Sequence, residues 1–150
     1  MRVLIQRVIR GEVEIERKTT ASIGRGLVIF LGVGQEDQEE DILWLCGKIC
    51  QMRIFNDSEQ KMNLSLRDVA GEVMVVSQFT LFASTKKGNR PGFSNAASGP
   101  VAKDLYLKFI HQLEKTGSIR VQKGEFGADM KIHLINDGPV TIWMDSKQKE

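Results

Sequence analysis

Cysteine and long hydrophobic runs are scarce in this sequence of 150 residues. The two cysteines, Cys46 and Cys50, are one helical turn apart, and so few cysteines cannot build a disulfide framework. No apolar run reaches the roughly 18 residues that a membrane-spanning helix needs. Arg7 and Arg10 interrupt the N-terminal stretch in which a signal peptide would be continuously apolar. We therefore expect a protein of the cytoplasm, a reducing compartment, with no membrane partner.

Histidine is also scarce, and neither sign of charge is in large excess. The two histidines, His111 and His133, stand near no Gly-x-Ser-x-Gly motif, so the sequence does not predict a His-based catalytic triad. Cys46 and Cys50 lie on an apolar helical stripe without further ligands, which favours core packing over a zinc site. The net charge of +2 is too small to identify a nucleic-acid binder by itself. We expect no metal and no organic cofactor.

Length and composition predict one folded domain over residues 1–150, because 41% hydrophobic and 27% charged residues are ordinary values for a globular chain. Residues 12–16 alternate between polar and apolar as a half-exposed strand does. Residues 27–33 are apolar on both faces and predict a buried central strand. Further strands are expected at 72–81, 130–136 and 140–145, the last two joined by a turn at residues 137–139.

Two helices are expected between the strands. Asp37 and Glu40 can form a capping box for the first, and Ser98 can serve as N-cap of a second helix that runs to about residue 115. The apolar stripes are Ile42, Leu45, Cys46 and Ile49 in the first helix and Val101, Leu105, Phe109 and Leu113 in the second. These patterns predict an α/β fold with mixed, barrel-like and layered β-sheets and two main helices packed on one side.

Two short segments carry polar groups where the apolar pattern stops. Ser77-Gln78-Phe79-Thr80 ends a strongly apolar strand, which is typical of a binding site at a strand's carboxyl end, although the hydroxyls can equally satisfy turn hydrogen bonds. Asn136-Asp137-Gly138-Pro139-Val140-Thr141 is first of all a turn between strands. Neither segment alone identifies a function.

Residues 83–97 form a long segment without periodicity, and long loops of this kind are usually functional or mobile. Lys86, Lys87 and Arg90 lie within it and make it locally basic. The loop is interpreted either as a solvated charged surface or as a contact for nucleic-acid phosphates.

Together, Ser77-Gln78-Phe79-Thr80-Leu81 and Asn136-Asp137-Gly138-Pro139-Val140-Thr141 resemble the two signature motifs of the D-aminoacyl-tRNA deacylase family, in the family's order and separation. Three further segments match the same family: Leu4-Ile5-Gln6-Arg7-Val8, Gly88-Asn89-Arg90-Pro91-Gly92-Phe93 and Phe126-Gly127-Ala128-Asp129-Met130. The resemblance runs from residue 1 to about residue 145. It implies hydrolysis of the ester that joins a D-amino acid, or glycine, to tRNA.

The resemblance also implies how chirality is selected. In this family the Gly-Pro bond, here Gly138-Pro139, is cis and is inserted into the active site of the partner subunit of a homodimer. Its main-chain carbonyls stand where an L-amino acid would place its side chain, so L-substrates clash while D-residues and glycine do not. Arg7 resembles the residue that holds this segment in position.

Catalysis is expected to involve the Ser77-Gln78-Phe79-Thr80 motif. Backbone N–H groups around Phe79 and Thr80 would stabilise the oxyanion, and Gln78 and Ser77 would bind the 3′-terminal adenosine or the amino group. Thr80 needs an adjacent base to act as a nucleophile, and residues 73–90 contain no His, Asp or Glu. We therefore favour attack by water, assisted by the free hydroxyl of the terminal ribose.

Other residues are assigned by looser matches. Ala102 and Phe126 are expected to line the pocket, and Lys86, Lys87 and Arg90 to contact tRNA phosphates without reading sequence. DNA is not expected as a partner. Two alternatives remain open: a non-catalytic RNA-binding or regulatory module with this fold, and a general esterase, which would need an activated Ser and a His.

Overall fold

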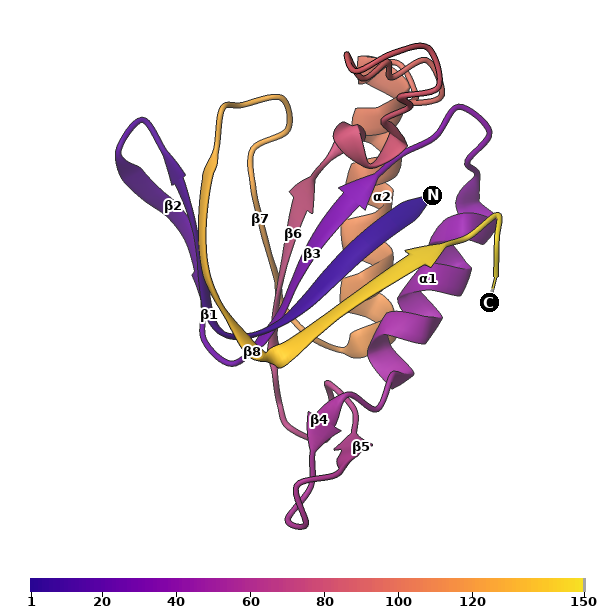
Figure 1. The fold of residues 1–150 in the computed structure, drawn as a ribbon. Coiled ribbons are helices and arrows are strands. Elements are labelled where there is room, and N and C mark those ends of the chain that lie inside the picture. Colours follow the sequence, from indigo (N-terminus) through magenta and orange to yellow (C-terminus); the bar gives the residue numbers. More distant parts are fainter. Residues whose placement is uncertain (150) are drawn as a thin grey trace.

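The computed structural model describes residues 1–149 and consists of a curved mixed sheet, a small hairpin and two long helices (Figure 1). The strands are β1 (Arg2–Ile15), β2 (Lys18–Ile23), β3 (Gly26–Gly32), β4 (Phe55–Asn56), β5 (Met62–Leu64), β6 (Glu72–Ser77), β7 (Val121–Lys123) and β8 (Lys131–Asp145). The helices are α1 (Glu39–Gln51), α2 (Gly99–Gly117) and the short 3-10 turn η1 (Phe79–Phe82). No helix among the described residues is long and apolar enough to cross a membrane.

The main sheet has the order β2-β1-β3-β6-β7, and β8 also pairs with the long strand β1. β1 runs antiparallel to β2, β3 and β8, whereas β3–β6 and β6–β7 are parallel. Figure 1 shows the strands curving like part of a barrel, with α1 and α2 side by side against one face. The predicted mixed α/β fold with two helices on one side is therefore confirmed.

The core lies between the sheet and the two helices. Ile42, Leu45 and Ile49 of α1 and Phe109 and Leu113 of α2 are all buried in one cluster with β1, β3 and β6. Each such side chain contributes roughly 1.5–3 kcal/mol by leaving water. This burial fixes the ends of β3 and β6, where the candidate site lies.

Cys46 and Cys50 are buried in this core, as the apolar stripe predicts. Burial, together with the neighbouring Cys50, raises the pKa of the Cys46 thiol to about 12, and burial also raises the pKa of Cys50. Both thiols are therefore protonated at neutral pH and are poor nucleophiles.

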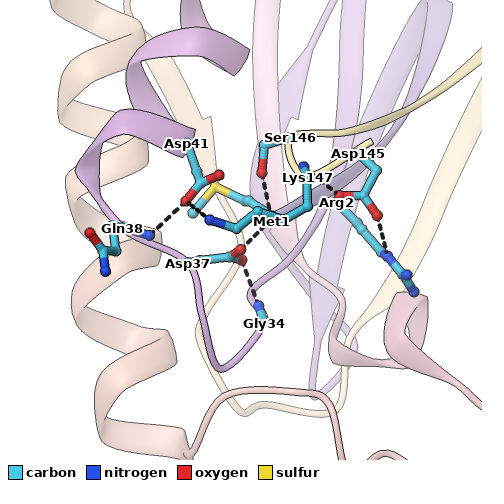
Figure 2. Close-up of polar contacts among 9 residues, drawn as sticks. All are labelled: Met1, Arg2, Gly34, Asp37, Gln38, Asp41, Asp145, Ser146 and Lys147. Carbon is cyan, nitrogen blue, oxygen red and sulfur yellow. Dashed lines mark hydrogen bonds and ion pairs between the residues drawn. The ribbon is translucent and has the colours of Figure 1, made fainter. Parts of the chain in front are cut away.

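The predicted capping box of α1 is wrong by one residue. The helix has Gln38 as N-cap, and its amide donates to Asp41 Oδ2 at 2.8 Å. Asp37 cannot cap because its carboxylate accepts hydrogen bonds from the Met1 ammonium and from the Gly34 amide (Figure 2). The contact with Met1, which no local sequence pattern reveals, thus engages the side chain that was expected to cap the helix.

Two strand boundaries and the burial of one residue also differ from the predictions. The strand expected to reach residue 81 ends at Ser77, because the chain turns into η1. The two strands expected at 130–136 and 140–145 are one continuous strand, β8. Val101 is 51% exposed, although the apolar stripe predicts its burial. A helix has 3.6 residues per turn, so side chains spaced by four residues move gradually around it. Val101, the first of the four expected positions, therefore lies off the buried face.

Asp41 gives one prediction about stability and pH. Burial alone would raise its pKa, but hydrogen bonds with Lys147, Ser146 and the Gln38 amide outweigh burial and lower the pKa from 3.8 to about 2. The carboxylate should therefore stabilise the fold by about 2 kcal/mol above pH 3.8, and this contribution should disappear as the pH falls through 2. Unfolding free energies of wild type and Asp41→Asn, measured by urea from about pH 2 to pH 7, should converge at the acid end of this range. A difference independent of pH would contradict this assignment.

Candidate functional site

A cavity of about 580 Å³ opens where β3 and β6 end, beside the N-terminus of α2. β3 and β6 are parallel neighbours, so their carboxyl ends meet at one edge of the sheet, the usual place for a ligand in α/β folds. Five of the residues predicted for the site line this cavity: Ser77, Gln78, Phe79, Ala102 and Phe126. The structure thus brings together residues that lie far apart in the chain, from the end of β6, from α2 and from the segment after β7.

The floor of the cavity is apolar. Tyr106 is buried there, its hydroxyl donates to the Val75 carbonyl at 2.9 Å, and its ring lies 5.7 Å from that of Phe126. Burial raises the pKa of Tyr106 well above its usual value, so the phenol stays neutral. Tyr106 can shape the cavity but cannot act as a base at neutral pH.

The turn η1 lies beside the cavity, which Ser77 and Gln78 line directly before the turn and Phe79 lines at its start. Its first residues, Phe79 and Thr80, occupy positions whose N–H groups have no acceptor within the turn. The preceding Gln78 amide donates to the Leu31 carbonyl at 2.7 Å, which ties the start of the turn to the end of β3. Gln78 and Phe79 both line the cavity, so the two N–H groups at the start of η1 belong to a segment that borders it.

Thr80 lies in η1 but is not among the residues that line the cavity. Its hydroxyl accepts a hydrogen bond of 2.5 Å from the side-chain amide of Gln78. An amide donor holds the oxygen but cannot remove its proton, so this contact gives Thr80 no general base.

Two further residues of the cavity, Phe93 and Asp129, were not predicted as site residues from the sequence. The Phe93 ring meets the exposed Phe79 ring edge to face, with centroids 4.9 Å apart. Asp129 pairs with Lys131 at 2.9 Å and is largely exposed. Both belong to segments that match the family, but only the fold shows that these segments meet at one cavity.

Gly138 and Pro139 lie on a bulge of β8 opposite Arg7. Gln6 pairs with Thr141 and Val8 with Asn136, so the four residues 137–140 stand across from Arg7 alone. The Asn136 side-chain amide closes the base of this bulge, donating to the carbonyls of Arg7 at 2.9 Å and Val140 at 3.0 Å. The Gly138-Pro139 peptide bond is cis, and both residues are exposed.

Arg7 holds the bulge from within the protein. It is only 4% exposed, and its Nη1 donates to the Ile54 carbonyl at 2.5 Å. Its Nε lies 3.0 Å from Asp137 Oδ2, an ion pair in which Nε makes no hydrogen bond. A Cβ on Gly138 would come within 2.8 Å of Arg7 Nη2, so the backbone of the bulge rests directly on the guanidinium.

The bulge does not line the cavity of its own chain, and Gly138, Pro139 and Arg7 are absent from the cavity wall. Figure 1 shows β8 bending sharply at the end of the sheet opposite the tip of β6. Within one chain, the two predicted motifs are therefore separated.

The basic residues Lys86, Lys87 and Arg90 are exposed on a loop beside the cavity. Mutual backbone hydrogen bonds of Ser84 and Gly92, at 2.8 and 2.9 Å, close the loop directly before Phe93 of the cavity wall. Among residues 1–149, none of these three cations has an ion-pair partner. The same residues contain no cluster of three or more His, Cys, Asp or Glu side chains that could hold a metal ion.

The curved sheet and the cavity at the ends of its parallel strands define an α/β protein whose cavity lies where ligands usually bind in such folds. The family model described as D-Tyr-tRNA(Tyr) deacylase matches residues 4–145, and the chain belongs to this family. The resemblance inferred from the sequence is thereby confirmed.

Relatives and solved structures agree with this assignment. The chain is 53% identical over 150 residues to the D-aminoacyl-tRNA deacylase of Flavobacterium johnsoniae and 54% identical over 149 residues to that of Christiangramia forsetii, covering at least 99% of each. The solved structure of a c-Myc DNA Unwinding Element Binding Protein superposes with a TM-score of 0.90 at 37% identity, covering 97% of this chain and 98% of the other. A probable eukaryotic D-amino acid tRNA deacylase shares the fold, with a TM-score of 0.82 at 19% identity, covering 95% and 97%.

Proposed function

We propose that this chain hydrolyses the ester bond between a D-amino acid and the 3′ end of tRNA, releasing free tRNA and the D-amino acid in the cytoplasm. The observation that carries the proposal is the cavity that gathers Ser77, Gln78, Phe79, Ala102 and Phe126 in a chain of the deacylase family. Its apolar floor suits the adenine ring and its open mouth suits a macromolecular ester.

The proposed chiral filter is the Gly138-Pro139 bulge of a partner subunit inserted into this cavity. Three observations support it: the bulge is exposed, it lies away from its own cavity, and its backbone is held by Asn136 and by the buried Arg7. The carbonyls of the two residues would occupy the position of an L side chain. Glycine has no side chain, so glycyl-tRNA would not be excluded. The active enzyme is then a homodimer.

In the proposed reaction, water attacks the ester carbonyl carbon and the bond to the ribose oxygen breaks. The N–H groups of Phe79 and Thr80 stabilise the oxyanion, while Ser77 and Gln78 orient the terminal adenosine or the amino group. The adjacent ribose hydroxyl assists proton transfer to the leaving oxygen. No side-chain base is needed, which agrees with the contacts of Thr80.

Thr80→Ala should retain substantial activity, because this mechanism uses the backbone of Thr80 and not its hydroxyl. The expected kcat for D-tyrosyl-tRNA is within about tenfold of wild type, since only the Gln78 contact, a single hydrogen bond, is lost. Single-turnover deacylation measures this directly. Complete loss of turnover with retained substrate binding would restore Thr80 as the nucleophile.

Binding of tRNA should depend strongly on salt. If Lys86, Lys87 and Arg90 contact phosphates, replacing all three by Gln should lower the slope of log Kd against log salt by about 2–3. The slope can be measured by filter binding of uncharged tRNA between about 50 and 200 mM salt. An unchanged slope would remove the loop from the binding surface.

The proposed function is tested by following matched D-tyrosyl-tRNA and L-tyrosyl-tRNA with the purified protein. Rapid loss of the D-ester with survival of the L-ester supports both the reaction and the filter. Cleavage of neither ester would favour a non-catalytic nucleic-acid-binding module, an alternative in keeping with the structural neighbour named for binding a DNA unwinding element. Cleavage of both would contradict the filter alone.

A further inference from the structure

We propose that Arg2 is a positioning residue for the reaction, because its guanidinium holds η1 and thereby places the N–H groups of Phe79 and Thr80. The inference rests on the proposed function for its catalytic consequence. It concerns a residue at the first position of β1 that does not line the cavity.

The position of η1 needs an explanation, because hydrophobic burial does not supply it. None of its four residues is buried, and the ring of Phe79 is 56% exposed. Two backbone hydrogen bonds, from Leu81 to the Gln78 carbonyl and from Ala83 to the Thr80 carbonyl, shape the turn but do not attach its end to the sheet. Side-chain contacts must therefore fix that end.

Arg2 supplies these contacts from the neighbouring strand. Its Nη1 donates to the Leu81 carbonyl at 3.0 Å, a group at the end of the turn that has no intrahelical donor. Its guanidinium carbon lies 4.4 Å from the centroid of the Phe82 ring, within the range of a cation–π contact. Both contacts hold the C-terminal end of η1.

Phe82 also lies close to two glycines, Gly32 at the end of β3 and Gly34 just after it. A Cβ on Gly34 would come within 2.8 Å of the Phe82 ring, and a Cβ on Gly32 within 3.1 Å of Leu81 Cβ. Leu81 and Phe82 therefore pack on backbone that carries no side chain, and Arg2 also contacts both residues.

Asp145 holds Arg2 itself in place. Its Oδ2 accepts a hydrogen bond of 2.8 Å from Arg2 Nε, and its side chain is mostly buried (Figure 2). The planar guanidinium can bond Asp145, bond Leu81 and stack on Phe82 at once, whereas a lysine ammonium cannot stack in the same way.

Arg2→Gln tests the inference, and Arg17→Gln is the matched control. Arg17 lies in the exposed turn between β1 and β2 and makes no side-chain hydrogen bond or ion pair with the described residues. For D-tyrosyl-tRNA, we expect Arg2→Gln to lower kcat about 10- to 100-fold, less than the loss of a whole oxyanion donor, with KM within about twofold.

The conservative variant and an activity-independent readout complete the experiment. Arg2→Lys should recover part of kcat, and Arg17→Gln should match wild type. Amide hydrogen exchange of Leu81 and Ala83 should accelerate in Arg2→Gln while that of β3 does not. If Arg2→Gln fails to fold, kcat and amide exchange are compared with wild type in Arg2→Lys and Phe82→Leu instead.

Wild-type kcat and wild-type exchange in folded Arg2→Gln would overturn the inference, as would a raised KM with unchanged kcat. If wild-type protein cleaves no D-ester but exchange in η1 accelerates in Arg2→Gln, the proposed function is contradicted. The structural part of the inference, that Arg2 holds η1, is then still supported. The two failures are therefore distinguishable.

Discussion

Gly138→Ala is expected to lose most of the discrimination between D- and L-aminoacyl-tRNA. Gly138 has a φ of +115°, a conformation that costs an L-residue about 1–3 kcal/mol. Its new Cβ would lie 2.8 Å from Arg7 Nη2 and 3.0 Å from Val140 Cγ2. Arg7 cannot yield, because it is buried and bonded to the Ile54 carbonyl, so the bulge must move.

A displaced bulge carries the proposed carbonyl obstruction with it. We expect the ratio of kcat/KM for D-tyrosyl-tRNA over L-tyrosyl-tRNA to fall about 10- to 100-fold, equivalent to roughly 1.4–2.7 kcal/mol of discrimination. Gly47→Ala is the control, because a Cβ at that helical position meets no atom within 4 Å. Unchanged discrimination in folded Gly138→Ala would show that the bulge is not the filter.

Asp37→Asn is expected to cause the largest loss of stability. The Asp37 carboxylate and the Met1 ammonium form an ion pair with side-chain exposures of 3% and 0%. One carboxylate oxygen accepts from the ammonium and the other from the Gly34 amide, at 2.6 Å. Asparagine has a single oxygen, so its NH₂ group must face one of two donors. Breaking a buried pair in this way costs about 3–5 kcal/mol.

This loss is a large share of the roughly 5–15 kcal/mol that stabilises an ordinary domain, so the midpoint of urea unfolding should fall clearly. Glu59→Gln is the matched control, because it breaks an ion pair with Lys61 that is exposed on both sides. The control should change stability by about 0–1 kcal/mol. A loss below about 1 kcal/mol in Asp37→Asn would mean that water replaces the missing charge.

The fold was predictable wherever one pattern decided the structure. The apolar run at 27–33 and the helical stripe through Leu45 and Ile49 specify elements by periodicity alone, and the structure has both. The misplaced cap and the early end of β6 share another cause. The Asp37 carboxylate bonds the Met1 ammonium, and the Gln78 amide bonds the Leu31 carbonyl. Both contacts join residues too far apart in the sequence for a local pattern to predict them.

The candidate site was predictable in its parts but not in its arrangement. Ser77, Gln78 and Phe79 could be selected as polar or exposed positions at the end of an apolar strand, and Phe126 from a family segment. The separation of Gly138 from this cavity, the role of Arg2 and the presence of Asp129 depend on strand register and on contacts between distant elements. A register shift of a few residues cannot be read from alternation alone.

The pairing of β1 with β8 has a consequence for how the chain folds. Arg2 pairs with Asp145 and Glu14 with Lys131, so one side of the first strand is completed by residues made more than a hundred positions later. During synthesis, β1 can pair with β2 and β3 early but keeps an unsatisfied edge until β8 emerges. Such long-range pairing slows folding and exposes a strand edge to other nascent chains in the meantime. The same pairing of β8 with β1 brings Asp145 to Arg2 and sets the Gly138 bulge against Arg7.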